Sequence, residues 1–298
     1  MSFLCFKLFF LIPALTFCTG GGINSGQTVQ TGEQIVVIPE LPSKITFAGE
    51  DVPLNYFDVR ESLQREMTVI SYWHSSMILI FQNNNRYKRE IMKILKDEDV
   101  PEDFYYLCIA ESGLQPVSSY AGACGYWQFL AATAKEYGLV VDDEVDERYN
   151  VEKSTRAAAA YFKKAHSELG SWTLAAASYN IGLANVKYRK KIQFQNNYYD
   201  MQFPEETGRY VFRALAFKTI MNDPGKYGYK LDKEQLYPEF EYKEVTVNTP
   251  IENWSAFAAK HRTNFKLLKM YNQWIRSNNL TNKNRNTFIV RIPKEGTR

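Results

Sequence analysis

Apolar residues recur at helical spacing along the first half of the chain. Between residues 56 and 101 they fall three or four positions apart, as in Met77, Ile80 and Phe81. One face of a helix repeats every 3.6 residues, so this pattern predicts helices rather than strands. The same reading predicts further helices over residues 101–112, 125–137, 151–169, 172–180 and 205–221. Residues 41–223 are therefore expected to form an all-α domain.

The pattern changes after Pro224. Residues 224–241 are rich in turn formers, which indicates a linker. Residues 242–298 then read as strand, helix, helix and strand, a small α+β module. The fold class expected overall is mainly α. Because the linker separates the two regions, the sequence alone predicts that the helical domain folds and acts without the module.

The N-terminus has the features of an export signal. Lys7 precedes a ten-residue apolar run, Leu8 to Phe17, which is too short to span a bilayer. Residues 1–18 are thus expected to be a signal peptide or lipoprotein signal, and residues 19–40 a flexible linker. Cys18 stands where a lipoprotein carries its acylated cysteine, but Phe17 replaces the usual small residue. Lipid anchoring and simple cleavage nearby both remain open, and export to the periplasm or cell envelope is expected.

Charge and cysteine content exclude some classes. The formal net charge of +3 over 298 residues argues against a nucleic-acid partner. Beyond the export signal only Cys108 and Cys124 remain, which is no disulfide framework, and we expect two buried thiols. No metal or cofactor is expected.

The stretch "LCIAESGLQP" places Glu111 at the end of a predicted helix. Apolar neighbours withhold water from this carboxyl group, and the negative end of the helix dipole disfavours its ionised form. Both effects raise its pKa, and a carboxyl group that stays protonated near neutral pH can act as a general acid. Taken alone, the stretch also fits an ordinary solvated glutamate near a helix end.

Four ordered motifs carry a resemblance to a known family. "ESGLQP", "AGACGYWQF", "AASYN" and "ETGRYV" follow one another between residues 111 and 211. The region from about Tyr56 to Met221 thereby resembles the goose-lysozyme-like lytic transglycosylases, in particular the membrane-bound lytic transglycosylase D group. The C-terminal module resembles a degenerate LysM module, a glycan-binding fold, although "NTPIEN" replaces the usual Gly-Asp-Thr. For this module, glycan binding and a purely packing role are both open.

The resemblance implies a set of site residues. It makes Glu111 the single catalytic acid/base, with Ser112 and Ser119 in its immediate surroundings. Substrate-binding roles carry over to the remaining motif residues: Gly125, Trp127, Gln128, Tyr179, Asn180 and Tyr210. For the motif aromatics and amides the alternative is structural, with Trp127 and Tyr179 as core residues and Gln128 and Asn180 as polar groups at helix ends. Glu206 and Thr207 shape the start of their helix or contribute to the site.

The implied reaction is cleavage of peptidoglycan glycan strands between N-acetylmuramic acid and N-acetylglucosamine. It leaves a 1,6-anhydromuramyl end and consumes no water. Glycosidases commonly use two carboxylates, but the resemblance gives a catalytic role to Glu111 alone. The acidic cluster downstream is interpreted as a solvated loop: Asp142, Asp143, Glu144, Asp146 and Glu147. A hydrolytic muramidase on the same fold and a non-catalytic peptidoglycan-binding protein are the alternatives.

Overall fold

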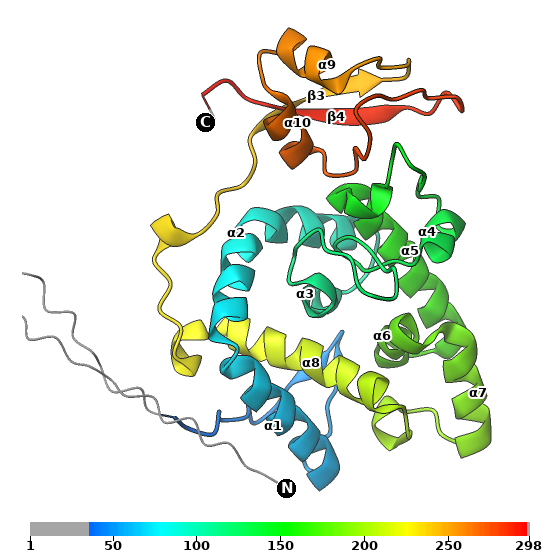
Figure 1. The fold of residues 1–298 in the computed structure, drawn as a ribbon. Helices are drawn as coiled ribbons and strands as arrows, with labels where there is room; N and C mark the ends of the chain where they lie inside the picture. The colour runs from blue at the N-terminus through cyan, green and yellow to red at the C-terminus, as the bar shows by residue number, and fades with distance from the viewer. Residues whose placement is uncertain (1–35, 297–298) are drawn as a thin grey trace, which may run out of the picture. The chain divides into compact units, whose positions relative to one another are not determined.

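The computed structural model describes residues 36–296. The predicted export signal, Cys18 and most of the predicted N-terminal linker lie outside these residues. Within them, two hydrophobic clusters are present, one in a helical part and one in a C-terminal module. The mainly α fold with a small strand module is confirmed (Figure 1).

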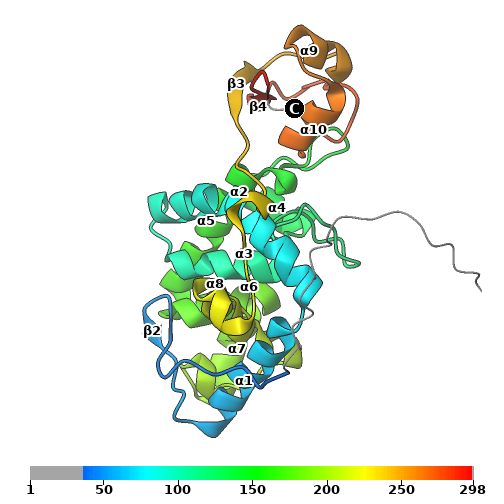
Figure 2. The ribbon, with the colours of Figure 1, turned by 90° about the vertical axis from the view of Figure 1, so that its left-hand side faces the viewer.

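The helical part surrounds one central helix. Figures 1 and 2 place α3 among the other helices, and it packs against α2 and α8. Its residues Tyr105 to Ile109 are buried, so a short helix of eight residues is held by its surroundings. The helices are α1 (Phe57–Ser71), α2 (His74–Asp97), α3 (Tyr105–Ser112), α4 (Ala131–Glu136), α5 (Val151–Leu169), α6 (Trp172–Ile181), α7 (Leu183–Gln193) and α8 (Glu205–Asn222).

Side-chain size and capping explain the packing of α5 and α6. Ala158 and Phe162 on the predicted apolar face of α5 are fully buried. Asn150 caps the start of α5, and Ser171 caps the start of α6. A short hairpin precedes α1, formed by β1 (Thr46–Phe47) and β2 (Glu50–Asp51).

Two expectations for helices need correction. The helix expected over residues 125–137 begins only at Ala131, because Gly125 and Gln128 have positive φ angles of 81° and 50° and cannot continue a right-handed helix. No helix was expected after residue 180, but α7 follows there. Val186 is its one buried residue, so the segment carries almost no apolar periodicity.

The C-terminal module has the predicted order of elements. It consists of β3 (Tyr242–Val247), α9 (Trp254–Lys260), α10 (Phe265–Tyr271) and β4 (Phe288–Pro293). The two strands pair antiparallel, from Tyr242 opposite Pro293 to Val247 opposite Phe288. Val145 of the helical part belongs to the module's hydrophobic cluster. The module thus completes its core with a residue from outside its own sequence.

Candidate active site

Glu111 lies on the last turn of α3. The helix ends at Gly113, whose φ of 60° is left-handed and whose N–H donates to the Ile109 carbonyl at 2.8 Å. Glycine adopts this conformation without the steric cost that a Cβ brings, which explains why the helix stops directly after the acid. Glu111 is consequently half-buried at the edge of the helical core.

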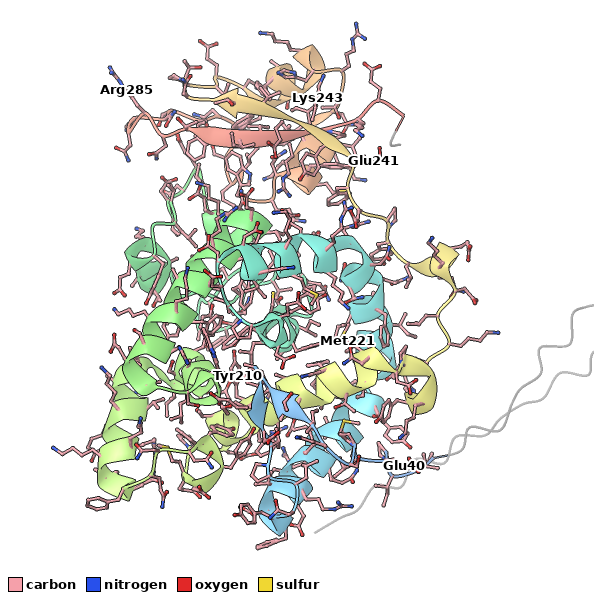
Figure 3. The ribbon with its side chains drawn as sticks, turned by 180° about the vertical axis from the view of Figure 1, so that it is seen from behind. Glu40, Tyr210, Met221, Glu241, Lys243 and Arg285 are labelled. Carbon is pink, nitrogen blue, oxygen red and sulfur yellow. The ribbon has the colours of Figure 1, made fainter. Side chains whose placement is uncertain are left out.

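The surroundings of Glu111 raise its pKa from the ordinary 4.5 to about 7. Burial is the largest cause, since it penalises the charged form, and Glu206 adds to the shift. Tyr210, whose hydroxyl donates a hydrogen bond to Glu111 Oε1, and Arg213 oppose it by favouring the carboxylate. Tyr210 lies on α8 (Figure 3). A carboxyl group with this pKa can both give and take a proton at neutral pH.

The loop after α3 is fastened to the helix end. Ser112 Oγ donates to the Tyr126 carbonyl at 2.7 Å. Gln128 Nε2 donates to the carbonyls of Val117 and Gly125 at 3.0 and 2.8 Å, so its amide closes the loop on itself. Ser112 and Gln128 therefore fix the loop beside Glu111.

Gly125 is required by a close backbone approach. Its φ is 81°, and a Cβ at this position would lie 1.9 Å from the Arg148 carbonyl oxygen. Such a distance lies far inside van der Waals contact, so any side chain would push the loop away from the segment that carries Arg148. Gly125 thus acts through the backbone.

Arg148 stabilises the loop beside Glu111, although it lies outside the four motifs; we call it the brace of this loop. Its side chain is buried and donates through Nη1 to the carbonyls of Gly122 and Phe129, both at 3.1 Å. Asp146 holds it with two further bonds, from Nε at 2.9 Å and from Nη2 at 2.7 Å. One guanidinium therefore ties both ends of the glycine-containing turn.

The acidic cluster is only partly the solvated loop that was expected. Asp146 and Glu147 are buried, with 7% and 4% of their surface exposed. Asp146 pairs with Arg148, and Glu147 accepts from the Val140 N–H at 2.9 Å. The interpretation as a solvated loop is wrong for these two residues, because their partners compensate the loss of water.

The third motif joins the loop to α8. Trp127 has no exposed surface, and its Nε1 donates to Thr155 Oγ1 at 2.9 Å, which places its ring in the core. Its carbonyl accepts from Tyr179 Oη at 2.7 Å. Asn180 Oδ1 accepts from Thr207 Oγ1 at 2.6 Å, and Asn180 Nδ2 donates to Glu206 at 3.3 Å. Tyr179 and Asn180 hence connect α6 to the loop and to α8.

A pocket of about 270 Å³ opens beside Glu111. Glu111 is the one acidic side chain that lines it, within residues 36–296. The other lining residues include Trp73, Leu79, Ile80, Ser112, Gln115, Arg213 and Phe217. Ser119 does not line the pocket: it lies in an exposed turn, where its Oγ accepts from the Ala123 N–H at 3.1 Å.

Arg213 and Trp73 line the pocket but were not predicted from the sequence. Arg213 stands three residues after Tyr210 on α8, a spacing that puts both on one side of a helix and that could have revealed it. Trp73 precedes α2 and lies in no motif.

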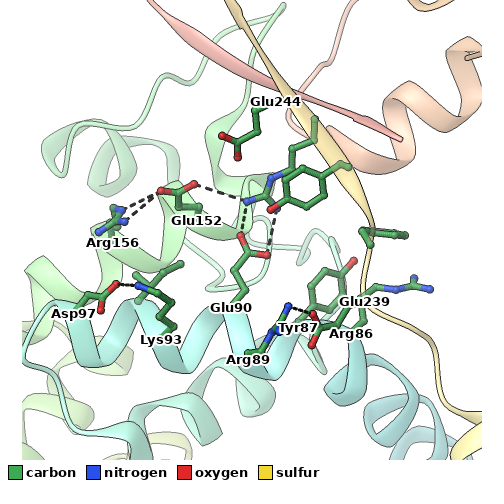
Figure 4. A pocket seen from close by; sticks show the side chains of 14 residues that line it. Arg86, Tyr87, Arg89, Glu90, Lys93, Asp97, Glu152, Arg156, Glu239 and Glu244 are labelled. Atoms are coloured by element: carbon green, nitrogen blue, oxygen red, sulfur yellow. Dashed lines mark hydrogen bonds and ion pairs between the residues drawn. The ribbon is translucent and has the colours of Figure 1, made fainter. Parts of the chain in front are cut away.

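A larger cavity of about 460 Å³ lies between α2, α5 and the module, and Figure 4 shows its charged lining. Its charges are largely paired with one another: Arg291 donates to Glu90 at 3.2 Å, and Arg156 lies 3.3 Å from Glu152. The pair Arg291–Glu90 connects β4 to α2, whereas Arg156–Glu152 lies within α5. The cavity thus lies between the two regions and is lined mostly by paired charges, and its one acid whose side chain has no hydrogen-bond or ion-pair partner among residues 36–296, Glu244, is exposed.

Two further properties concern cofactors and membranes. No cluster of three or more His, Cys, Asp or Glu residues suited to hold a metal ion occurs in the part of the chain that the structure describes. Among the helices of that part, none combines the length and apolar character needed to cross a membrane.

Comparison with known families identifies both regions. Residues 89–202 match the transglycosylase SLT domain, and residues 243–296 match the soluble lytic transglycosylase C-terminal LysM-like domain. The chain therefore contains an SLT domain followed by a LysM-like domain, which confirms the resemblance seen in the sequence. The SLT match includes Glu111, whereas Tyr210 lies beyond its end.

Individual relatives are lytic transglycosylases. The chain is 28% identical over 194 residues to the membrane-bound lytic murein transglycosylase D of Escherichia coli strain K12 and to that of strain O6:H1. These matches cover 62% of this chain and 42% of each relative, so the chain spans about two fifths of their length. A solved structure of an inactive mutant of the lytic transglycosylase Slt from Pseudomonas aeruginosa is 21% identical, with a TM-score of 0.42. The match covers 61% of this chain and 31% of the Slt chain.

Proposed function

We propose that the protein is a peptidoglycan lytic transglycosylase that acts in the cell envelope, with Glu111 as its single general acid/base. Its substrate is the glycan strand, cut between N-acetylmuramic acid and N-acetylglucosamine. The SLT domain match and the names of the relatives support the reaction class. The geometry around Glu111 supports the assignment of the acid.

Glu111 serves twice in the proposed reaction. Its proton first passes to the oxygen that links the two sugars, and the bond from that oxygen to the muramyl C1 breaks. The neighbouring N-acetyl group stabilises the cation at C1. The C6 hydroxyl oxygen then attacks C1, and its proton returns to Glu111. A 1,6-anhydro ring closes, the acid is regenerated, and no water enters the balance.

The observation that carries this proposal is the isolation of one acid with a raised pKa. Glu111 is protonated to a useful extent near pH 7 and is the one carboxyl group lining its pocket in the described residues. A substrate that supplies its own nucleophile needs no second carboxylate. Glu206, on the first turn of α8, is exposed and hydrogen-bonded to Asn180. Its charge raises the pKa of Glu111, so it is the neighbouring carboxylate to test for a hydrolytic mechanism.

Product analysis tests the proposal. Purified full-length protein is incubated with glycan strands, and the released fragments are weighed by mass spectrometry. We expect 1,6-anhydromuramyl ends from the wild type and none from Glu111→Gln, which keeps the size of the side chain but has no acidic proton. Reducing muramic acid ends would identify a hydrolytic muramidase instead. Binding without any cleavage would identify a non-catalytic wall protein.

Glu206→Gln is the matched control. It removes a neighbouring carboxylate of the same length, and we expect anhydro products at a rate within a few-fold of the wild type. A loss of activity as complete as that of Glu111→Gln would make Glu206 a second catalytic carboxylate and would contradict the single-acid mechanism.

A further inference from the structure

The Glu111 pocket is lined by both apolar and polar side chains. Trp73, Leu79, Ile80 and Phe217 supply apolar surface, and Glu111, Gln115 and Arg213 supply polar groups. Trp73 has 49% of its surface exposed. An exposed indole costs free energy in water, and its position beside a candidate catalytic acid calls for a binding role.

The backbone at Trp73 is fixed on both sides. Its N–H donates to the Ile70 carbonyl at 3.1 Å, and its own carbonyl accepts from the Met77 N–H at 2.8 Å. Trp73 therefore stands at a hydrogen-bonded corner between α1 and α2.

The neighbouring rings hold the same corner. Tyr72 and His74 lie with ring centroids 5.8 Å apart, and the Tyr229 hydroxyl donates to the Ser71 carbonyl at 2.7 Å. Among residues 36–296 no aromatic ring packs on Trp73, although both of its sequence neighbours have one. The corner thus fixes the backbone that carries the indole, and about half of the Trp73 surface stays exposed.

We propose that Trp73 is a stacking platform for a pyranose ring of the glycan strand, in the sugar subsite next to Glu111. The inference rests on the proposed function, because it names how that site holds its substrate. A pyranose presents C–H groups on one face and hydroxyl or N-acetyl groups at its rim. Trp73 offers a flat apolar partner for the face, and Gln115 and Arg213 offer donors for the rim.

Tryptophan fluorescence tests the contact without catalysis. All five tryptophans lie in the described residues: Trp127, Trp254 and Trp274 are buried, and Trp172 stacks on His166 at 3.9 Å. We titrate full-length Glu111→Gln with the tetramer of N-acetylglucosamine and expect a saturable change in emission. Adding Trp73→Phe should abolish this change, whereas adding Trp172→Phe should leave it. A change that persists in the Trp73→Phe variant, or no change in Glu111→Gln, overturns the proposal.

Kinetics on soluble glycan strands separate this inference from the proposed function. Trp73→Ala should raise the KM about tenfold with kcat nearly unchanged, and Trp73→Phe should raise it less, because a smaller ring still stacks. The control is Tyr188→Ala, which removes an exposed ring of α7 that does not line this pocket. Anhydro products with an unchanged KM in Trp73→Ala would leave the proposed function standing and contradict the platform. Absence of anhydro products from the wild type would contradict the proposed function itself.

Discussion

Glu111 in the helical part and Asn272 in the LysM-like module are both polar side chains withdrawn from solvent. Asn272 has no exposed surface and is fully paired: Nδ2 donates to the carbonyls of Leu268 and Arg291, and Oδ1 accepts from the Arg291 N–H at 2.7 Å. Glu111 accepts from Tyr210 and stays hard to ionise. The difference separates a polar group that holds the chain in place from one whose burial raises its pKa.

The helical part and the LysM-like module contact each other through Val145 and Asp146, close to Arg148 in the chain. Val145 packs in the module's core, and the Asp146 N–H donates to the Trp274 carbonyl at 2.9 Å. Tyr126, in the loop beside Glu111, donates to Gln273 Oε1 at 2.7 Å. These contacts argue against an independent module, because Asp146 and Tyr126 also belong to the loop beside Glu111 or to its support, and deletion of residues 242–298 tests that expectation.

Deletion of residues 242–298 should have the largest effect. The deletion removes the module residues that contact Val145, Asp146 and Tyr126. Without them the loop beside Glu111 can shift, and a displacement of about 1 Å can lower the rate about 100-fold. We expect kcat on soluble glycan strands to fall by about 10- to 100-fold, with helical content by circular dichroism largely retained. If the module were only a tether, cleavage of a soluble substrate would be unchanged and only action on intact sacculi would weaken.

Arg148→Met tests the brace directly. The substitution removes the guanidinium that pairs with the buried carboxylate of Asp146. Breaking a buried ion pair by removing one partner typically costs about 3–5 kcal/mol. We expect a loss of this size in the free energy of unfolding, measured with denaturant. Arg156→Met is the matched control: its pair with Glu98 is partly exposed and should contribute less than about 1 kcal/mol. Equal losses in the two variants would show that Arg148 braces nothing.

Glu111→Gln and Asn272→Ala should change stability in opposite directions. The pKa of Glu111 is raised from 4.5 to about 7, so the folded state binds more protons than the unfolded state between these values and loses stability as pH rises through them. The variant escapes this loss and should be more stable above pH 8, by up to about 3 kcal/mol, and similar to wild type below pH 4. Asn272→Ala leaves backbone groups unpaired and should cost about 2 kcal/mol at every pH. A Glu111→Gln variant no more stable than wild type at pH 8 would contradict the raised pKa.

The sequence predicted those elements whose signal is local. Repeating apolar positions predicted α2 and α5, and the strand–helix–helix–strand order of the module was correct. The helix α7 was missed because it buries only Val186, and α4 begins late because Gly125 and Gln128 turn the backbone left-handed. The first error thus comes from a helix with almost no apolar periodicity, and the second from a loop conformation that local periodicity does not reveal.

The candidate site likewise contains residues that local motifs predicted and residues that they did not. The motifs led to Glu111 and Tyr210, which the structure places in hydrogen-bond contact. They could not reveal that Asp146 is buried, since this depends on Arg148 and on the module. The motifs also could not show that Trp127 acts in two ways: its ring packs in the core, and its carbonyl accepts a hydrogen bond from Tyr179. Burial depends on the folded structure and cannot be predicted from a short motif.

Tyr210→Phe should have the smallest effect and the most specific one. In the proposed mechanism protonated Glu111 is the active acid, so kcat/KM should stay level below about pH 6 and fall as pH rises through a single midpoint near 7. The Tyr210 hydroxyl lowers the pKa of Glu111 by favouring the carboxylate. Its loss should move this midpoint to higher pH, by about 0.7 pH unit for a hydrogen bond of about 1 kcal/mol. Tyr198→Phe is the control, because that hydroxyl donates to the carbonyls of Thr207 and Gly208 at 2.8 Å and should affect stability without moving the midpoint. A midpoint that stays fixed in Tyr210→Phe, or moves equally in both variants, would mean that Tyr210 positions the chain as Asn272 does and does not tune the acid.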